Sequence, residues 1–161
     1  MPEMTLLGWF HTILGVLAVL SGFYTLYKYR VISYDVSSGK LYILVTLLVA
    51  GSALGIYNQG GFGVAHILAV LTLIALAGGY IMERYKWFGS FSKYFQALGY
   101  TSTLLFHMIP AITDFLRRLP VGDPFIDSFE DPLLLNFHMA FLIIYLLGII
   151  AQMIWLKRQA T

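Results

Sequence analysis

Residues 133–156 read LLLNFHMAFLIIYLLGIIAQMIWL, without one charged side chain. A helix that crosses a bilayer needs roughly 20 mostly apolar residues, and this stretch is long enough. Asp131 and Pro132 stand directly before it, and proline in the first turn is a helix-start signal. The stretch therefore predicts a membrane-spanning helix over about 133–156.

The composition of the whole chain agrees with a membrane environment. The 161 residues are 59% hydrophobic and 11% charged, with a mean hydropathy of +0.78. Soluble domains carry roughly 25% charged residues, so this chain could not cover a soluble surface. It has no cysteine, which excludes disulfides, thiolate metal ligands and thiol nucleophiles. The formal net charge of +2 gives no reason to expect nucleic acid as a partner.

Four further apolar runs precede this helix, at about 4–27, 40–57, 62–82 and 95–116. Polar residues interrupt the last of these four. A membrane helix tolerates such residues when they face the bundle interior, and a soluble excursion is the alternative. The five runs predict an all-α fold, an integral membrane bundle of five transmembrane helices. We expect a single domain over 1–161, with an outward-facing loop at 119–132.

The positive charges orient this bundle. If the helices alternate in direction, eight of the ten Lys and Arg residues fall on one side: Lys28, Arg30, Lys40, Arg84, Lys86, Lys93, Lys157 and Arg158. Arg117 and Arg118 fall on the other side, among most of the acidic residues. The positive-inside rule places the basic side in the cytoplasm. We therefore expect a multi-pass protein of the bacterial inner membrane, with its N-terminus outside and its C-terminus cytoplasmic.

The chain has four histidines, and each lies in a different predicted helix: His11, His66, His107 and His138. At about 1.5 Å of rise per residue, all four lie roughly 7–13 Å inside the outward ends of their helices. A lone histidine at this depth is often an interhelical hydrogen-bonding residue or reaches the headgroups. Burial disfavours the charged imidazole, and the neutral form is the one that ligates iron, copper or zinc. The shared depth therefore predicts a common metal or haem site.

Small residues follow His11 along its helix. Gly8, Gly15 and Gly22 recur every seven residues on the face that carries His11. Glycine lets another group approach the backbone closely. Gly15 is therefore a candidate cofactor-binding position that leaves a slot for a flat macrocycle, and close packing against the small residues of 51–55 is the alternative.

Tyr100, Thr103, His107 and Asp114 lie on one stripe of their helix. This spacing suggests that the first two and Asp114 support the His107 imidazole from nearby positions. Asp114 could equally be a helix-end carboxylate in the headgroup region. The sequence assigns no catalytic residue, because no nucleotide loop, serine elbow or Glu-x-x-His pair is present.

Three short motifs open the first three predicted helices: HTILG at 11–15, GKLY at 39–42 and GVAHIL at 63–68. In these motifs the chain resembles an uncharacterised family of small bacterial predicted membrane proteins. The family has no established activity, so the resemblance implies a multi-pass topology alone. The arrangement of histidines is also similar to b-type cytochrome bundles, which hold haem between histidines of neighbouring helices.

These observations lead to one expected function and two alternatives. We expect haem b bound through two of the four imidazoles, serving electron transfer or a redox reaction with a quinone or an outer-side partner. The first alternative is a copper or zinc ion held by three or four of the histidines. The second is an accessory subunit of a larger membrane complex, which could ligate a pigment. A homo-oligomer is a further expectation.

Overall fold

The computed structural model describes residues 5–57 and 61–159, and these residues form helices joined by loops. The α-helices are α1 (Leu6–Tyr29), α2 (Ser37–Ala53), α3 (Val64–Tyr85), α4 (Ser92–Arg118) and α5 (Pro132–Arg158), and a short 3₁₀ helix, η1 (Gly89–Phe91), precedes α4. The predicted all-α fold of five helices is confirmed for this part of the chain. Met4, at the start of the first expected helix, and residues 58–60, between the second and third expected helices, lie outside the described residues.

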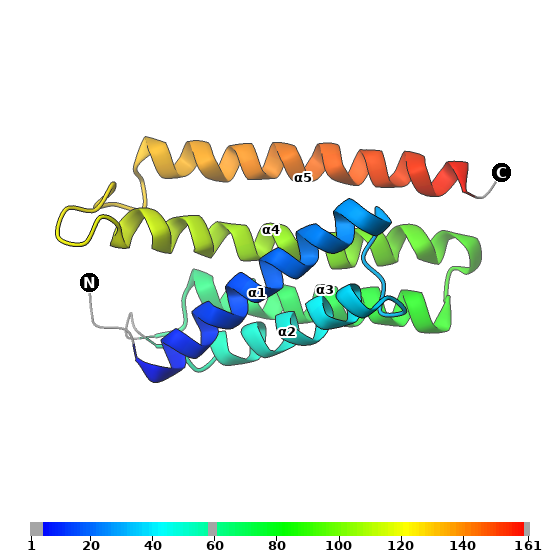
Figure 1. Ribbon diagram of the computed structural model, residues 1–161, viewed down its shortest axis with the longest axis horizontal. Coiled ribbons are helices and arrows are strands. Elements are labelled where there is room, and N and C mark those ends of the chain that lie inside the picture. Colours follow the sequence, from blue (N-terminus) through cyan, green and yellow to red (C-terminus); the bar gives the residue numbers. More distant parts are fainter. Residues whose placement is uncertain (1–4, 58–60, 160–161) are drawn as a thin grey trace.

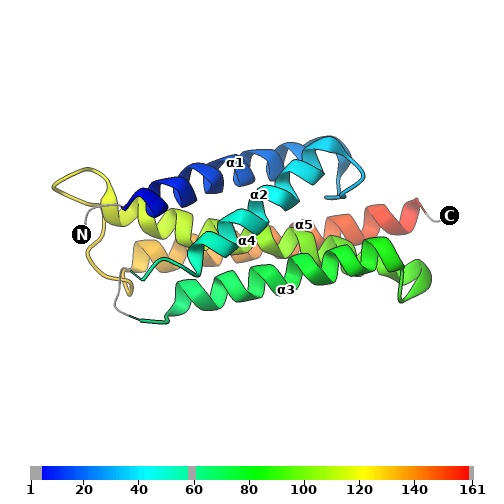
Figure 2. The ribbon, with the colours of Figure 1, turned by 90° about the horizontal axis from the view of Figure 1, so that it is seen from below.

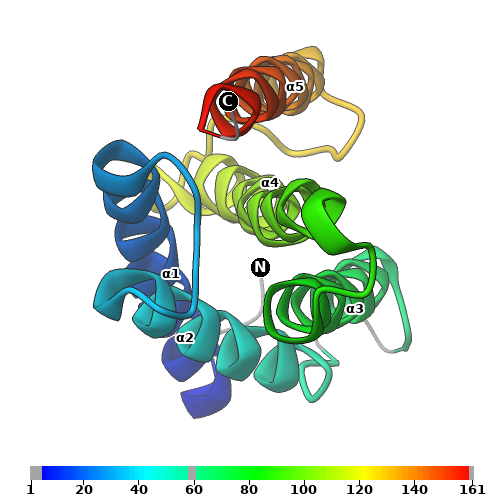
Figure 3. The ribbon, with the colours of Figure 1, turned by 90° about the vertical axis from the view of Figure 1, so that its right-hand side faces the viewer.

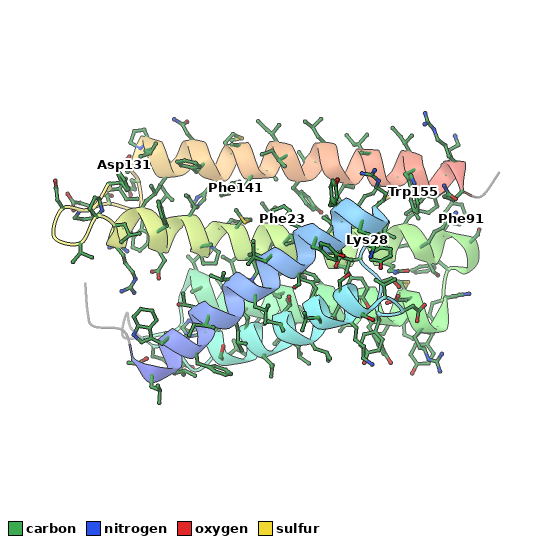
Figure 4. All side chains as sticks on the ribbon, viewed as in Figure 1. Phe23, Lys28, Phe91, Asp131, Phe141 and Trp155 are labelled. Carbon is green, nitrogen blue, oxygen red and sulfur yellow. The ribbon has the colours of Figure 1, made fainter. Side chains whose placement is uncertain are left out.

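Consecutive α-helices run in opposite directions along one long axis (Figures 1 and 2). One end of the bundle, which we call the basic end, holds the C-terminal ends of α1, α3 and α5 and the N-terminal ends of α2 and α4. The opposite, acidic end carries the loop at 119–131. Phe91 lies at the basic end and Asp131 near the acidic end in Figure 4. The expected separation of the charges is therefore present in the fold.

Helices α1 to α4 surround a common interior, and α5 lies outside it against α4 (Figure 3). The core cluster includes Ala18 of α1, Tyr42 of α2, and Tyr100 and Leu104 of α4. Only Leu134, Gln152 and Leu156 of α5 are buried. Many of the other α5 side chains are large, apolar and exposed (Figure 4).

Three helices, α1, α3 and α5, are long and apolar enough to cross a membrane by length and composition. Helix α2 has 17 residues and is a shorter apolar helix. Helix α4 has the length but a more polar sequence, because it carries several of the bundle's buried polar side chains. Tyr100, Thr101, Thr103 and His107 are all buried. Several of the residues that interrupt this run therefore face inward, as expected.

Helices α3 and α4 approach each other closely at two glycines. A Cβ added at Gly99 would lie 2.8 Å from the carbonyl oxygen of Ala75 and 3.1 Å from the nitrogen of Gly79. These distances are below ordinary van der Waals contact. Glycine at position 99 is therefore what allows the two backbones to pack.

Candidate functional site

A small cavity of about 60 Å³ lies inside the four-helix interior, in the half nearer the acidic end. Its walls come from His11 of α1, from Val49, Ala50 and Ala53 of α2, from Ala65, Leu68, Ala69 and Thr72 of α3, and from Phe106, His107 and Pro110 of α4. Alanines on two facing helices leave this space unfilled. Two of the four histidines thus line one cavity.

The hydrogen bonds of His11 determine which ring nitrogen carries its proton. Nδ1 lies 3.1 Å from the Val49 carbonyl oxygen and 3.0 Å from Ser52 Oγ. A carbonyl oxygen can only accept, and the Ser52 hydroxyl already donates to the same carbonyl at 2.9 Å. His11 Nδ1 therefore donates. Nε2 keeps its lone pair, without a partner among the described residues.

His107 is held by hydroxyl groups of α2 and α4. Its Nε2 lies 3.1 Å from Thr46 Oγ1, and the imidazole is 8% exposed. Thr46 in turn interacts with the Tyr42 hydroxyl, which bonds to Thr103 Oγ1. The Thr46 hydroxyl can thus accept from His107 Nε2 while its own proton turns towards Tyr42. This arrangement would leave His107 Nδ1 with a lone pair, and Nδ1 has no partner among the described residues.

His66 is buried at the start of α3 but does not line the cavity. The backbone N–H of Gly63 donates to its Nδ1 at 3.1 Å, so the proton of the neutral ring is on Nε2. The ring packs against Phe62 and Tyr57, with centroid distances of 5.0 and 4.7 Å. Nε2 is buried without a hydrogen-bond partner. In this tautomer His66 has no lone pair to offer a metal.

His138 lies between α4 and α5. The Thr113 hydroxyl donates to the Ile109 carbonyl at 2.7 Å, so Thr113 Oγ1 accepts from His138 Nε2 at 3.2 Å. Because α5 packs outside the four-helix interior, this imidazole does not line the cavity. Residues 5–57 and 61–159 contain no group of three or more His, Cys, Asp or Glu residues that could hold a metal ion. The fold brings His11 and His107 to one cavity and leaves His66 and His138 elsewhere.

The residues expected to support His107 have other partners. The Tyr100 hydroxyl donates to Glu83 Oε2 at 2.8 Å, towards the basic end. A helical side chain points back towards the N-terminus of its helix, which for α4 leads away from His107. Thr103 donates to the Tyr100 carbonyl and contacts His107 only through Tyr42 and Thr46.

Asp114 forms an ion pair with Arg118 at 2.9 Å, within α4. Asp114 makes no hydrogen bond to His11 or His107 among the described residues, so its expected support of the His107 imidazole stays a prediction.

The glycines of α1 differ from one another. A Cβ at Gly22 would lie 2.8 Å from both Tyr42 and Leu104, so this position is required for helix packing. A Cβ at Gly15 would meet no atom within 4 Å. Gly15 does not line the histidine cavity, so a cofactor slot beside it stays a prediction, and Gly22 packs against Tyr42 and Leu104 rather than against residues 51–55.

Glu83 is a partly buried interaction centre that was not expected from the sequence. Its Oε1 accepts from Ser33 Oγ and from the Tyr34 backbone nitrogen at 2.9 Å, and its Oε2 accepts from Tyr100. This carboxylate therefore joins α3 to α4 and to the α1–α2 loop. One signal was available: Glu83 is an isolated acid at the end of an apolar run, on the side where most charges are positive.

The cavity fits an ion better than a porphyrin. Pockets for drug-sized ligands take roughly 300–1,000 Å³, and this cavity measures about 60 Å³. That volume is enough for a bare ion or about two water molecules. The residues present therefore do not fit haem b within this cavity, and two imidazole nitrogens are the donors that it offers.

Comparison with models of protein families, with curated proteins and with solved structures finds no match to this chain. The resemblance to small bacterial membrane proteins stays a prediction.

Proposed function

We propose that the chain is an integral membrane protein of the bacterial inner membrane, with five spanning helices and its acidic end outside. The length and hydropathy of α1, α3 and α5 support this proposal. Helix α4 would cross the bilayer because its polar residues face the bundle interior. Helix α2 extends about 26 Å, slightly less than the hydrocarbon core. The collection of positive charges at the basic end supports the orientation.

We propose further that the protein binds one copper ion between His11 and His107 and serves metal handling or redox chemistry on the outer side. The observation that carries this proposal is the shared cavity, in which each ring has one nitrogen without a partner among the described residues. A histidine that donates Nδ1–H to a backbone carbonyl, as His11 does, is the usual arrangement of a metal ligand.

Imidazole suits copper, zinc, iron and nickel. Two considerations favour copper over zinc and haem, the other groups expected from the sequence. Zinc requires about four ligands, whereas copper(I) is stable with two nitrogens. Haem needs more space than the cavity has. The expected quinone and the outer-side redox partner stay predictions, as does assembly into a homo-oligomer or a larger complex.

The test is copper binding by purified protein in neutral detergent, measured by copper(I) titration against a chromogenic chelator and by elemental analysis. We expect one ion per chain. His11→Gln and His107→Gln should each weaken binding, while His138→Gln is the matched control because that ring bonds to Thr113 outside the cavity.

Three outcomes would contradict the copper proposal. A Soret band in the purified protein would show that it binds haem instead of copper. Equal copper affinity of the His107→Gln and His138→Gln variants would show that the ion binds outside the cavity. Protein that binds neither copper nor haem, with normal folding of every histidine variant, would favour the accessory-subunit alternative.

A further inference from the structure

A second, larger cavity lies at the basic end, between the end of α3 and the start of α4. Its volume is about 390 Å³, and it is lined by Met82, Glu83, Lys86, Gly89, Ser90, Ser92, Lys93 and Gln96. We call it the basic-end pocket. It is separate from the histidine cavity, which lies nearer the acidic end.

The hydrogen-bonding groups left over in this pocket are mostly donors. Lys93 Nζ uses one proton on the Leu156 carbonyl at 2.9 Å and keeps two. Ser92 Oγ accepts from the Phe88 backbone nitrogen at 3.0 Å, so its own proton is free to donate. The side chains of Lys86 and Ser90 have no hydrogen-bond or ion-pair partner among the described residues.

The two other polar residues of the wall are already engaged elsewhere. The Glu83 carboxylate accepts hydrogen bonds from Ser33 and Tyr34 of the α1–α2 loop and from Tyr100 of α4. Gln96 Nε2 donates to the Ile32 carbonyl at 3.1 Å. The wall of the pocket therefore includes two lysines and two serines with protons left to donate, and one carboxylate that already accepts three hydrogen bonds from neutral groups. Such a set of donors recognises an anion rich in acceptor oxygens, and a phosphate diester fits this description.

The surroundings of the pocket suggest which phosphate it meets. Trp87, Phe88 and Phe91 in the adjoining turn are all more than half exposed, and Phe91 lies at the tip of this end (Figure 4). Exposed aromatic residues beside lysines are typical of the headgroup layer of a membrane. Basic pockets at the cytoplasmic ends of helices bind anionic lipid headgroups.

We infer that the basic-end pocket binds the phosphate of an anionic phospholipid of the inner leaflet. This inference rests on the proposed membrane location, and it is independent of the copper site. It also gives a role to Lys86 of the α3–α4 turn and to Lys93 of the first turn of α4, which line one pocket.

The experiment titrates the purified protein in neutral detergent with short-chain phosphatidylglycerol, with phosphatidylcholine and with inorganic phosphate. Bound lipid is read by native mass spectrometry, and the midpoint of thermal unfolding is read in parallel. We expect phosphatidylglycerol to bind and stabilise, and the other two to do neither. Lys86→Gln should weaken phosphatidylglycerol binding about fivefold, the effect of one lysine at a lipid surface.

Lys157→Gln is the matched control, since it removes a positive charge at the same end but outside the pocket. Ser90→Ala tests the pocket without a change of charge and should also weaken binding. If Lys86→Gln and Lys157→Gln lowered the affinity for phosphatidylglycerol equally, the lipid would be attracted to the basic surface in general, and the inference would be overturned. Equal binding of the two lipids, or stabilisation by inorganic phosphate alone, would overturn it as well. Membrane fractionation and copper titration test the proposed function separately.

Discussion

The Tyr42 hydroxyl of α2 bonds to Thr103 Oγ1 of α4 in the centre of the bundle, where both side chains are completely buried. Thr103 donates its proton to the Tyr100 carbonyl at 2.7 Å, so Tyr42 is the donor in this pair. The Tyr42 oxygen is then available to accept from Thr46, which adjoins His107.

Replacement of Tyr42 by Phe should therefore affect both stability and the proposed copper site. Loss of the hydrogen bond should lower the free energy of unfolding by about 0.5–1.5 kcal/mol. The Thr46 proton would then turn to His107 Nε2, which moves the imidazole proton to Nδ1 and weakens copper binding. Thermal unfolding in detergent and copper(I) titration measure the two effects.

Tyr145→Phe provides the comparison, because it removes a 2.7 Å bond to Ser102 between α4 and α5, away from the cavity. It should lower stability to a similar extent and leave copper affinity unchanged. The same loss of affinity in both variants would contradict the proposed role of Tyr42.

Replacement of Glu83 by Gln should destabilise the basic end of the bundle. The amide can accept from only one side, so either Tyr100 or the Ser33–Tyr34 pair loses its acceptor. An unsatisfied buried group costs about 1–3 kcal/mol. A double-mutant cycle with Tyr100→Phe, followed by thermal unfolding, measures the coupling, and strictly additive effects would contradict a direct interaction.

Replacement of Gly99 by Ala should force α3 and α4 apart, because the new Cβ would lie 2.8 Å from the Ala75 carbonyl oxygen. Overpacking of this kind costs about 1–3 kcal/mol. Gly148→Ala in α5 meets no atom within 4 Å and should be neutral or stabilising by up to about 1 kcal/mol. Equal unfolding midpoints for the two variants would show that the close helix approach is unimportant.

The proposed orientation can be tested because the chain has no cysteine of its own. Ser128→Cys, in the loop at the acidic end, should react with a membrane-impermeant maleimide on intact cells. Gln159→Cys, after the last residue of α5, should react only once the cells are opened. Labelling in the reverse pattern would invert the topology.

Helix number and direction could be read from the residues because hydrophobic runs and their lengths are local properties. The inward orientation of the polar residues of α4 was also expected, since His107 and Thr103 had no other favourable place in an apolar helix. The role of Glu83 was not predicted because its three hydrogen-bond donors come from two other segments. The loop with Ser33 and Tyr34 has no sequence motif that predicts this contact.

The supporting role expected for Tyr100 could not be judged from spacing. A stripe at steps of three, four and seven places residues on one face, but the direction of each side chain decides which end of the helix it contacts. Tyr100 reaches Glu83 near the basic end, while His107 contacts Thr46 one helix away.

By itself, the amino-acid sequence determined the all-α class, the five helices and the separation of charge between the two ends, because hydropathy and charge act through position along the chain. Only the tertiary structure decided which histidines share a cavity. Helix α5 packs outside the other four and carries His138 with it, and the Gly63 N–H takes the lone pair of His66. The meeting of His11 with His107 depends on how four helices pack, which no single helix encodes.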